Sequence, residues 1–314
     1  MIQRLAGSIA VRLVLTAAIL GWMATRIDMA AAWHALVSVR LVAVLAVLGL
    51  VAIDRVMMIW RWVLLLHGTG TSIAAVDAAR IFLESSFVGS FLPAGVGGDA
   101  ARAWSLSREH ARGSTALASV AVDRLLGIVA LAMLVMIGVA VWASYIDPTL
   151  RVWVWSLSGL GLAGSAALLW VDRLARPFFH LVPVSASVRV KLERLTGALA
   201  DYRADPSLLL RVFVLSVLVQ ILRILQAWVL GIGLGVGVSF LYYFVFMPIG
   251  LLMLLLPISV SGFGVPQGVI VWLLRPQGVP DAQSFALSTL IVLSGLAGNL
   301  PGAWLYLTRR RTVS

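Results

Sequence analysis

Long apolar runs follow one another along almost the whole chain, and they constrain its fold more than any other feature. A run of about 20 apolar residues is long enough to cross a membrane as a helix. Mean hydropathy is +1.02 and only 12% of the residues are charged, values that a soluble core does not need. Such runs occur near residues 5–24, 41–66, 115–143, 151–171, 208–230, 240–256 and 284–306. The sequence therefore predicts a single all-α integral membrane domain over residues 1–314.

Two of the apolar stretches are interrupted in the same way, one in each half of the chain. Each interruption begins with Leu-Pro and continues into glycine. Proline removes a backbone donor and glycine weakens a helix, so we expect both segments to be unwound. Matched interruptions of this kind are typical of a transporter's binding site. The two segments run from Leu92-Pro93 to Gly97-Gly98-Asp99 and from Leu256-Pro257 through Ser259 to Gly262 and Gly264.

Lysine and arginine gather in three clusters, and this asymmetry predicts the topology. The clusters lie at residues 102–112, 173–203 and 309–311. Positive charge accumulates on the cytoplasmic side of membrane proteins. If all three clusters lie on that side, each Leu-Pro segment must enter and leave the membrane from the same side. The first segment does so from the cytoplasmic side, and the second does so from the opposite side. We therefore expect a polytopic protein with about seven to eight transmembrane helices, two opposed re-entrant hairpins and an inverted repeat.

The same reasoning places both termini on the cytoplasmic side of the membrane. We expect this membrane to be a bacterial-type plasma (inner) membrane. Two segments allow a second interpretation. Arg4 and Arg12 before an apolar run resemble a signal peptide, although an uncleaved first helix fits the predicted topology better. Residues 172–207 place apolar side chains at helical spacing among basic ones. This pattern fits either a helix lying on an anionic leaflet or an ordinary cytoplasmic connector.

Several ionisable side chains occur inside the apolar runs, where charge is costly and usually faces a partner or a pathway. They are Asp54, Arg55, Arg61, Asp123, Arg124 and Arg223. Gln220, Arg223 and Gln226 recur every third residue and form a polar strip along one helix. These charges either neutralise one another between helices or leave an excess of arginine that attracts an anion.

Phosphate is the anion that this set of residues fits best. Guanidinium groups bind phosphate oxygens with paired hydrogen bonds, and the backbone amides of Gly97-Gly98 at a helix start could add donors. Asp99 and Arg102 are three residues apart and are expected to pair, whereas the adjacent Asp123 and Arg124 are not. The candidate substrate-binding residues are Arg61, Pro93, Gly97, Gly98, Asp99, Arg102, Asp123, Arg124, Arg223, Pro257, Ser259, Gly262 and Gly264.

Signatures of enzymes, cofactors and metal sites are missing from the sequence. The chain contains no cysteine and no Gly-Lys-Ser/Thr phosphate loop, and its four histidines lack metal-ligand spacing. A net charge of +11 fits the positive-inside bias and anionic lipid heads better than nucleic acid. We therefore expect no enzymatic activity, no catalytic residue, no metal and no cofactor, with membrane lipids rather than nucleic acid as partners.

The order and spacing of these motifs resemble the lysylphosphatidylglycerol synthase transmembrane, or flippase-like, family. The resemblance covers only that family's membrane domain and implies an association with lipid movement between leaflets, without synthase activity. One departure is that Pro266-Gln267 stands where the family usually has Arg-Glu. The matching pieces are Arg61-Trp62, Leu92-Pro93 through Asp99 with Arg102, Asp123 through Gly127, and Leu256-Pro257-Ile258-Ser259 through Val265.

Together these features predict a transporter that moves an anionic, phosphate-bearing lipid or lipid-linked precursor between leaflets. Four arginines are expected to contact the head group, and two aspartates are expected to orient them or carry protons. Two alternatives stay open: a membrane subunit that scaffolds a lipid- or glycolipid-modifying enzyme, and an intramembrane transferase. The residues concerned are Arg61, Arg102, Arg124 and Arg223 for the head group, with Asp99 and Asp123 behind them.

Overall fold

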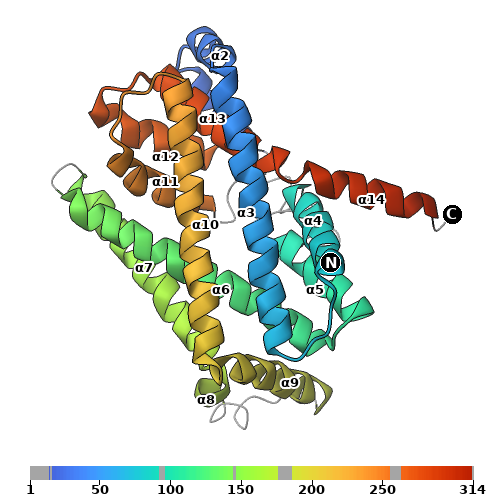
Figure 1. Ribbon diagram of the computed structural model, residues 1–314. Helices are drawn as coiled ribbons and strands as arrows, with labels where there is room; N and C mark the ends of the chain where they lie inside the picture. The colour runs from blue at the N-terminus through green and yellow to red at the C-terminus, as the bar shows by residue number, and fades with distance from the viewer. Residues whose placement is uncertain are drawn as a thin grey trace.

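The structure is a computed structural model that describes residue 14 and residues 16–91, 96–143, 146–175, 186–254 and 263–312. These residues are almost entirely α-helical (Figure 1). Five segments are long and apolar enough to cross a membrane: Leu41–Gly68, Gly113–Val141, Pro148–Leu169, Pro206–Gly233 and Asp281–Thr308. The prediction of an all-α, polytopic membrane protein is confirmed at this level.

Residues 16–24 belong to a first helical segment, which agrees with the predicted first helix. The helices that follow are α2 (Met29–Val37), α3 (Leu41–Gly68), α4 (Ala75–Phe91), α5 (Val96–Glu109), α6 (Gly113–Val141), α7 (Pro148–Leu169), α8 (Val171–Ala175), α9 (Ala186–Arg203), α10 (Pro206–Gly233), α11 (Phe240–Leu254), α12 (Val265–Leu274), α13 (Asp281–Ala297) and α14 (Leu300–Thr312).

Both α7 and α10 begin with an Asp-Pro pair that fixes where the helix starts. The carboxylate of Asp147 accepts a hydrogen bond from the Thr149 N–H at 2.8 Å, and that of Asp205 accepts one from the Leu208 N–H at 2.9 Å. The proline that follows each aspartate has no N–H, at a position where a helix would leave that donor unpaired. Local sequence therefore explains the start of two apolar helices.

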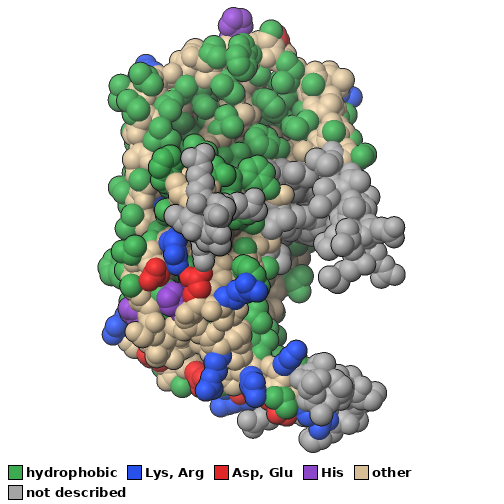
Figure 2. Space-filling view, turned by 90° about the vertical axis from the view of Figure 1, so that its right-hand side faces the viewer, with side chains coloured by type: hydrophobic (Ala, Val, Ile, Leu, Met, Phe, Trp, Pro, Cys, Tyr) green, Lys and Arg blue, Asp and Glu red, His purple; other side chains and the backbone are tan. Residues whose placement is uncertain are grey.

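Helices α3 and α10 lie side by side, run in opposite directions and define the two ends of the molecule (Figure 1). At one end the Arg40 N–H donates to the Gly233 carbonyl at 3.1 Å. At the other end the side chain of Leu208 occupies the space that a Cβ on Gly68 would take. The short helices α8 and α9 lie at this second end. In Figure 2, charged side chains gather over the lower part of the visible face and hydrophobic ones over the upper part.

Two helical hairpins begin at opposite ends of this frame. Helix α4 starts near the end of α3 and packs against α5, while α11 starts beyond the far end of α10 and packs against α12 (Figure 1). The four helices have 17, 14, 15 and 10 residues. At 1.5 Å per residue, the longest rises about 25 Å, less than the hydrocarbon core of a bilayer. The Leu-Pro connections at 92–95 and 255–262 lie outside the described residues, so their predicted unwinding stays a prediction.

The arms of the first hairpin touch through glycine. A Cβ on Gly98 of α5 would lie 2.9 Å from the carbonyl oxygen of Ser85 and 3.1 Å from the Cα of Gly89, both on α4. We expect Gly98→Ala to lower the free energy of unfolding by about 1–3 kcal/mol, since two backbones would have to separate. Thermal unfolding in detergent measures this change.

Gly164→Ala is the matched control for that substitution. Gly164 lies inside α7, and a Cβ there would meet nothing within 4 Å. Alanine should therefore stabilise α7 by about 0.5–1 kcal/mol through the lower entropy of the unfolded chain. Equal melting temperatures for the two variants would show that the hairpin does not depend on close approach at Gly98.

Two segments differ in detail from what the sequence indicated. Residues 25–40 were expected to be a connection, but they contain α2, whose start is fixed by the Asp28 carboxylate accepting from the Ala31 N–H at 2.9 Å. The run 284–306 was expected to be one helix, but it is divided into α13 and α14 near Gly298. Pro301 explains the division, because it cannot donate to the preceding turn and disfavours helical backbone just before it.

Helix α9 packs partly on the protein, and both interpretations of residues 172–207 stay predictions. Its buried residues Leu199 and Tyr202 contact the ends of α3, α6 and α10, and the Tyr202 hydroxyl donates to the Leu65 carbonyl at 3.1 Å. Arg203 at its end donates to Asp172 of α8 at 2.8 Å, and this bond lowers the pKa of Asp172 to about 2. Leu199 and Tyr202 of α9 thus pack against other helices, whereas Val190 of the same helix is 42% exposed.

Candidate functional site

A cavity of about 460 Å³ lies between α3, the α4–α5 hairpin, α6, α10 and α13. All six ionisable side chains that the sequence placed inside apolar runs line it, and Asp99 and Arg102 join them. Among the described residues the lining therefore contains five arginines and three aspartates, an excess of two positive charges. The charged lining residues are Asp54, Arg55, Arg61, Asp99, Arg102, Asp123, Arg124 and Arg223.

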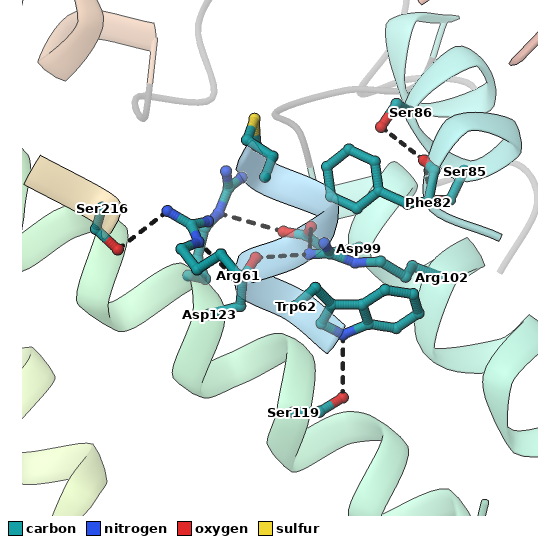
Figure 3. A network of polar contacts seen from close by, with 12 residues as sticks. Arg61, Trp62, Phe82, Ser85, Ser86, Asp99, Arg102, Ser119, Asp123 and Ser216 are labelled. Carbon is teal, nitrogen blue, oxygen red and sulfur yellow. Dashed lines mark hydrogen bonds and ion pairs between the residues drawn. The ribbon is translucent and has the colours of Figure 1, made fainter. Parts of the chain in front are cut away.

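Asp123 of α6 is the centre of the most buried part of this cluster (Figure 3). Its carboxylate lies 2.7 Å from the Nε of Arg61 and 3.3 Å from an Nη of Arg102, and all three residues are at most 5% exposed. Arg61 also donates to the Ser216 hydroxyl of α10 at 3.1 Å. One carboxylate shared by two guanidinium groups holds α3, α5 and α6 in a fixed arrangement.

Arg102 is further held by two aromatic rings. Its guanidinium carbon lies 5.2 Å from the ring centre of Trp62 and 5.1 Å from that of Phe82, within the range of cation–π attraction. The indole N–H of Trp62 donates to Ser119 at 3.4 Å (Figure 3). Because Arg102 is packed between these rings and Asp123, it has little freedom to follow a ligand.

Asp99 links the buried cluster to a more exposed arginine. Its carboxylate lies 3.0 Å from Arg102, as the spacing predicted, and 3.2 Å from the Nε of Arg124. The adjacent Asp123 and Arg124 take different partners, which confirms that they do not pair with each other. The side chain of Arg124 is 42% exposed, the highest value among the cavity arginines with an ion pair.

A second charged group lies where α3 faces α10. Asp54, with its side chain 3% exposed, lies 3.1 Å from the Nε of Arg223 and 3.7 Å from an Nη of Arg55. An Nη of Arg223 also donates to the sulfur of Met58 at 3.0 Å. The Arg223 side chain is 27% exposed. Asp54 and Met58 therefore belong to the site. The sequence marked Asp54 only as a charge in an apolar run, and it did not mark Met58.

The structure brings together only part of the predicted set of site residues. Seven of them line the cavity: Arg61, Gly98, Asp99, Arg102, Asp123, Arg124 and Arg223. Gly97 is one residue from the lining at the start of α5. Pro93, Pro257, Ser259 and Gly262 lie outside the described residues.

Gly264 has a structural position at the start of α12. Its φ is 100°, which favours glycine, and its N–H donates to the side-chain oxygen of Gln267 at 2.6 Å. Gln267 is fully buried. Glutamine and glutamate both serve as this kind of helix cap. The Gln267 departure from the family pattern therefore keeps the cap while removing its charge, and Pro266 occupies the first turn, where its missing N–H is tolerated.

Several polar residues of the lining were absent from the predicted set. Gln220 and Gln226 line the cavity with Arg223, as the polar strip on their helix allowed. Asn299, at the break between α13 and α14, donates to the Ser90 hydroxyl of α4 at 2.8 Å. Nothing in the sequence marked Asn299, because its place depends on the bend of the chain there.

These features define the class of the protein. It is a polytopic helical membrane protein with a positively charged cavity inside its helical bundle. Residues 9–301 match the family described as the lysylphosphatidylglycerol synthase TM region. The chain belongs to this family, which confirms the resemblance seen in its motifs. No curated protein matches the chain.

Proposed function

We propose that this protein moves an anionic, phosphate-bearing lipid between the two leaflets of its membrane. The observation that carries the proposal is that the described lining of one cavity in a membrane domain contains two more arginines than aspartates. Charge inside a membrane is costly and usually serves a pathway. An anionic head group would balance this excess, and its acyl chains would stay in the surrounding lipid.

Arg124 and Arg223 are the residues best suited to contact the head group. They come from α6 and α10, line the same cavity and keep 42% and 27% of their side chains exposed. Arg61 and Arg102 have only 6% of their side chains exposed and are held by Asp123. These two arginines therefore position the site, and Asp99 joins them to Arg124.

The two hairpins supply a route by which the cavity could open to either leaflet. Their short arms and opposite origins favour two re-entrant hairpins of inverted orientation, with the basic end of the molecule in the cytoplasm. A head group bound between the first hairpin and α10 would lie between the membrane side from which the first hairpin enters and the side from which the second hairpin enters. Lipid movement would then be downhill or coupled to an ion.

The direct test uses vesicles that contain the purified protein and a head-group-labelled lipid. We expect the exchange of labelled phosphatidylglycerol between leaflets to rise at least about tenfold over protein-free vesicles, because fixed guanidinium donors replace water around the phosphate. Phosphatidylcholine should gain much less. A membrane-impermeant quencher reports the exchange. Folded protein that speeds no anionic lipid would contradict the proposal and favour the scaffold role.

A further inference from the structure

Besides its arginines, the cavity is lined by side-chain amides with unpaired polar atoms. Gln220 and Gln226 lie on α10 on either side of Arg223, and they are only 6% and 8% exposed. Within the described part of the chain, the amide oxygen of Gln220 and the amide nitrogen of Gln226 are buried without a hydrogen-bond partner. The side-chain oxygen of Asn299 is buried in the same state.

Buried polar atoms in native proteins are almost always hydrogen-bonded, to protein or to ordered water, so these three amides call for polar partners that the described residues do not supply. Two of them are spaced along the helix that carries Arg223. Each is three residues from the arginine, a rise of about 4.5 Å on either side of it. A phosphate bound at Arg223 would therefore have an amide within reach on both sides.

Hydroxyl groups match this arrangement better than any other common head-group substituent. A hydroxyl both donates and accepts, so it pairs with a side-chain amide whichever way that amide is turned. An ammonium only donates, and it would enter a cavity whose described lining already has five arginines against three aspartates. Charge thus disfavours an amine, and the amides favour hydroxyls.

We infer that the cavity selects a lipid whose head group is a phosphorylated polyol without an amine, with Gln220 and Gln226 as the specificity-determining residues. The inference rests on the proposed function for its lipid and adds the chemistry of the head group. Arg223 would contact the phosphate, while the two glutamines, with Asn299, would contact the hydroxyls.

Binding to the purified protein in detergent tests the inference independently of transport. The probes are dioleoyl forms of phosphatidylglycerol, phosphatidylinositol, phosphatidic acid and phosphatidylserine, measured by native mass spectrometry. We expect the two polyol lipids to bind about five- to tenfold more tightly than phosphatidic acid and phosphatidylserine, the gain typical of a few hydrogen bonds. Free glycerol 3-phosphate should compete weakly at the same concentration.

The double variant Gln220→Met/Gln226→Met should lose this preference. Methionine has a similar length and no hydrogen-bonding amide, so it replaces an unpaired buried group and should leave the melting temperature unchanged or raise it. Gln283→Met is the matched control, since Gln283 lies outside the cavity lining and donates to the Leu234 carbonyl at 2.7 Å. It should keep the lipid preference of the natural chain.

Four results would overturn the inference. The first two are equal affinity for all four lipids and phosphatidylserine binding as tightly as phosphatidylglycerol. The third is a lipid preference that survives in the double variant. The fourth is a lower melting temperature of the double variant, which would show that the amides are structural. Competition by glycerol 3-phosphate as strong as by the lipid would assign the site to a soluble polyol phosphate instead. Preference without exchange in vesicles contradicts only the proposed transport, and exchange without preference contradicts only this inference.

Discussion

Asp123→Asn is expected to destabilise the protein by about 3–5 kcal/mol, the cost of removing one partner from a buried ion pair. Asp123 lies 2.7 Å from Arg61 and 3.3 Å from Arg102, and all three residues are at most 5% exposed. Asparagine fills the same space but leaves Arg61 without a carboxylate. A large drop in melting temperature in detergent, with loss of expressed protein, is the expected result.

Two further variants separate burial from charge. Asp281→Asn removes the carboxylate beside Arg275, whose side chain is 62% exposed, and should cost less than about 1 kcal/mol. Asp123→Asn combined with Arg61→Gln should recover part of the loss, because the uncompensated charge is removed too. A melting temperature of Asp123→Asn equal to that of Asp281→Asn would contradict a positioning role for the Asp123 cluster.

Arg223→Gln is expected to abolish the exchange of anionic lipid while leaving the fold intact. Asp54 would keep Arg55 at 3.7 Å, so no buried carboxylate would lose its last partner. The Arg223 side chain is also 27% exposed, which softens the structural cost of losing it. Exchange in vesicles should fall by at least about tenfold through the loss of a charge-assisted contact to phosphate.

Two further variants, Arg223→Lys and Arg275→Gln, serve as controls for this prediction. Lysine keeps the charge without the planar donor pair, so it should retain part of the activity. Arg275→Gln changes an exposed arginine outside the cavity lining and should have no effect on exchange. If Arg223→Gln fails to fold, or folds and keeps full exchange, Arg223 does not bind the head group.

The sequence could predict which charged residues gather in the cavity and the local pair Asp99–Arg102, but not the pairs between helices. Hydropathy locates helices because a membrane leaves few alternatives for long apolar runs, and this also marks Asp54, Asp123 and Arg223 as exceptional. Their partners depend on how helices pack. Asp54 meets Arg223 across 169 positions and Arg61 meets Asp123 across 62, distances at which no local rule applies.

The parts that could not be predicted share a physical reason. An amphipathic pattern shows that one face of α9 must be covered, but not whether lipid or Tyr202's neighbours cover it. The break near Gly298 is set by Pro301 and by the contact of Asn299 with Ser90, and only the first of these is visible in the sequence. Local sequence specifies where helices form. Tertiary packing determines what covers each helix and which side chains pair.

The order of the paired charges along the chain has a consequence for synthesis. Each of the three cavity aspartates has an arginine partner encoded before residue 125: Asp54 has Arg55, Asp99 has Arg102, and Asp123 has Arg61. Chains are made from the N-terminus, so these carboxylates can be neutralised before α10 leaves the ribosome. Arg223 then enters a bundle whose acids are already matched. The last of the described cavity arginines to arrive is thus one that no carboxylate requires for its burial, and Arg124 is the other.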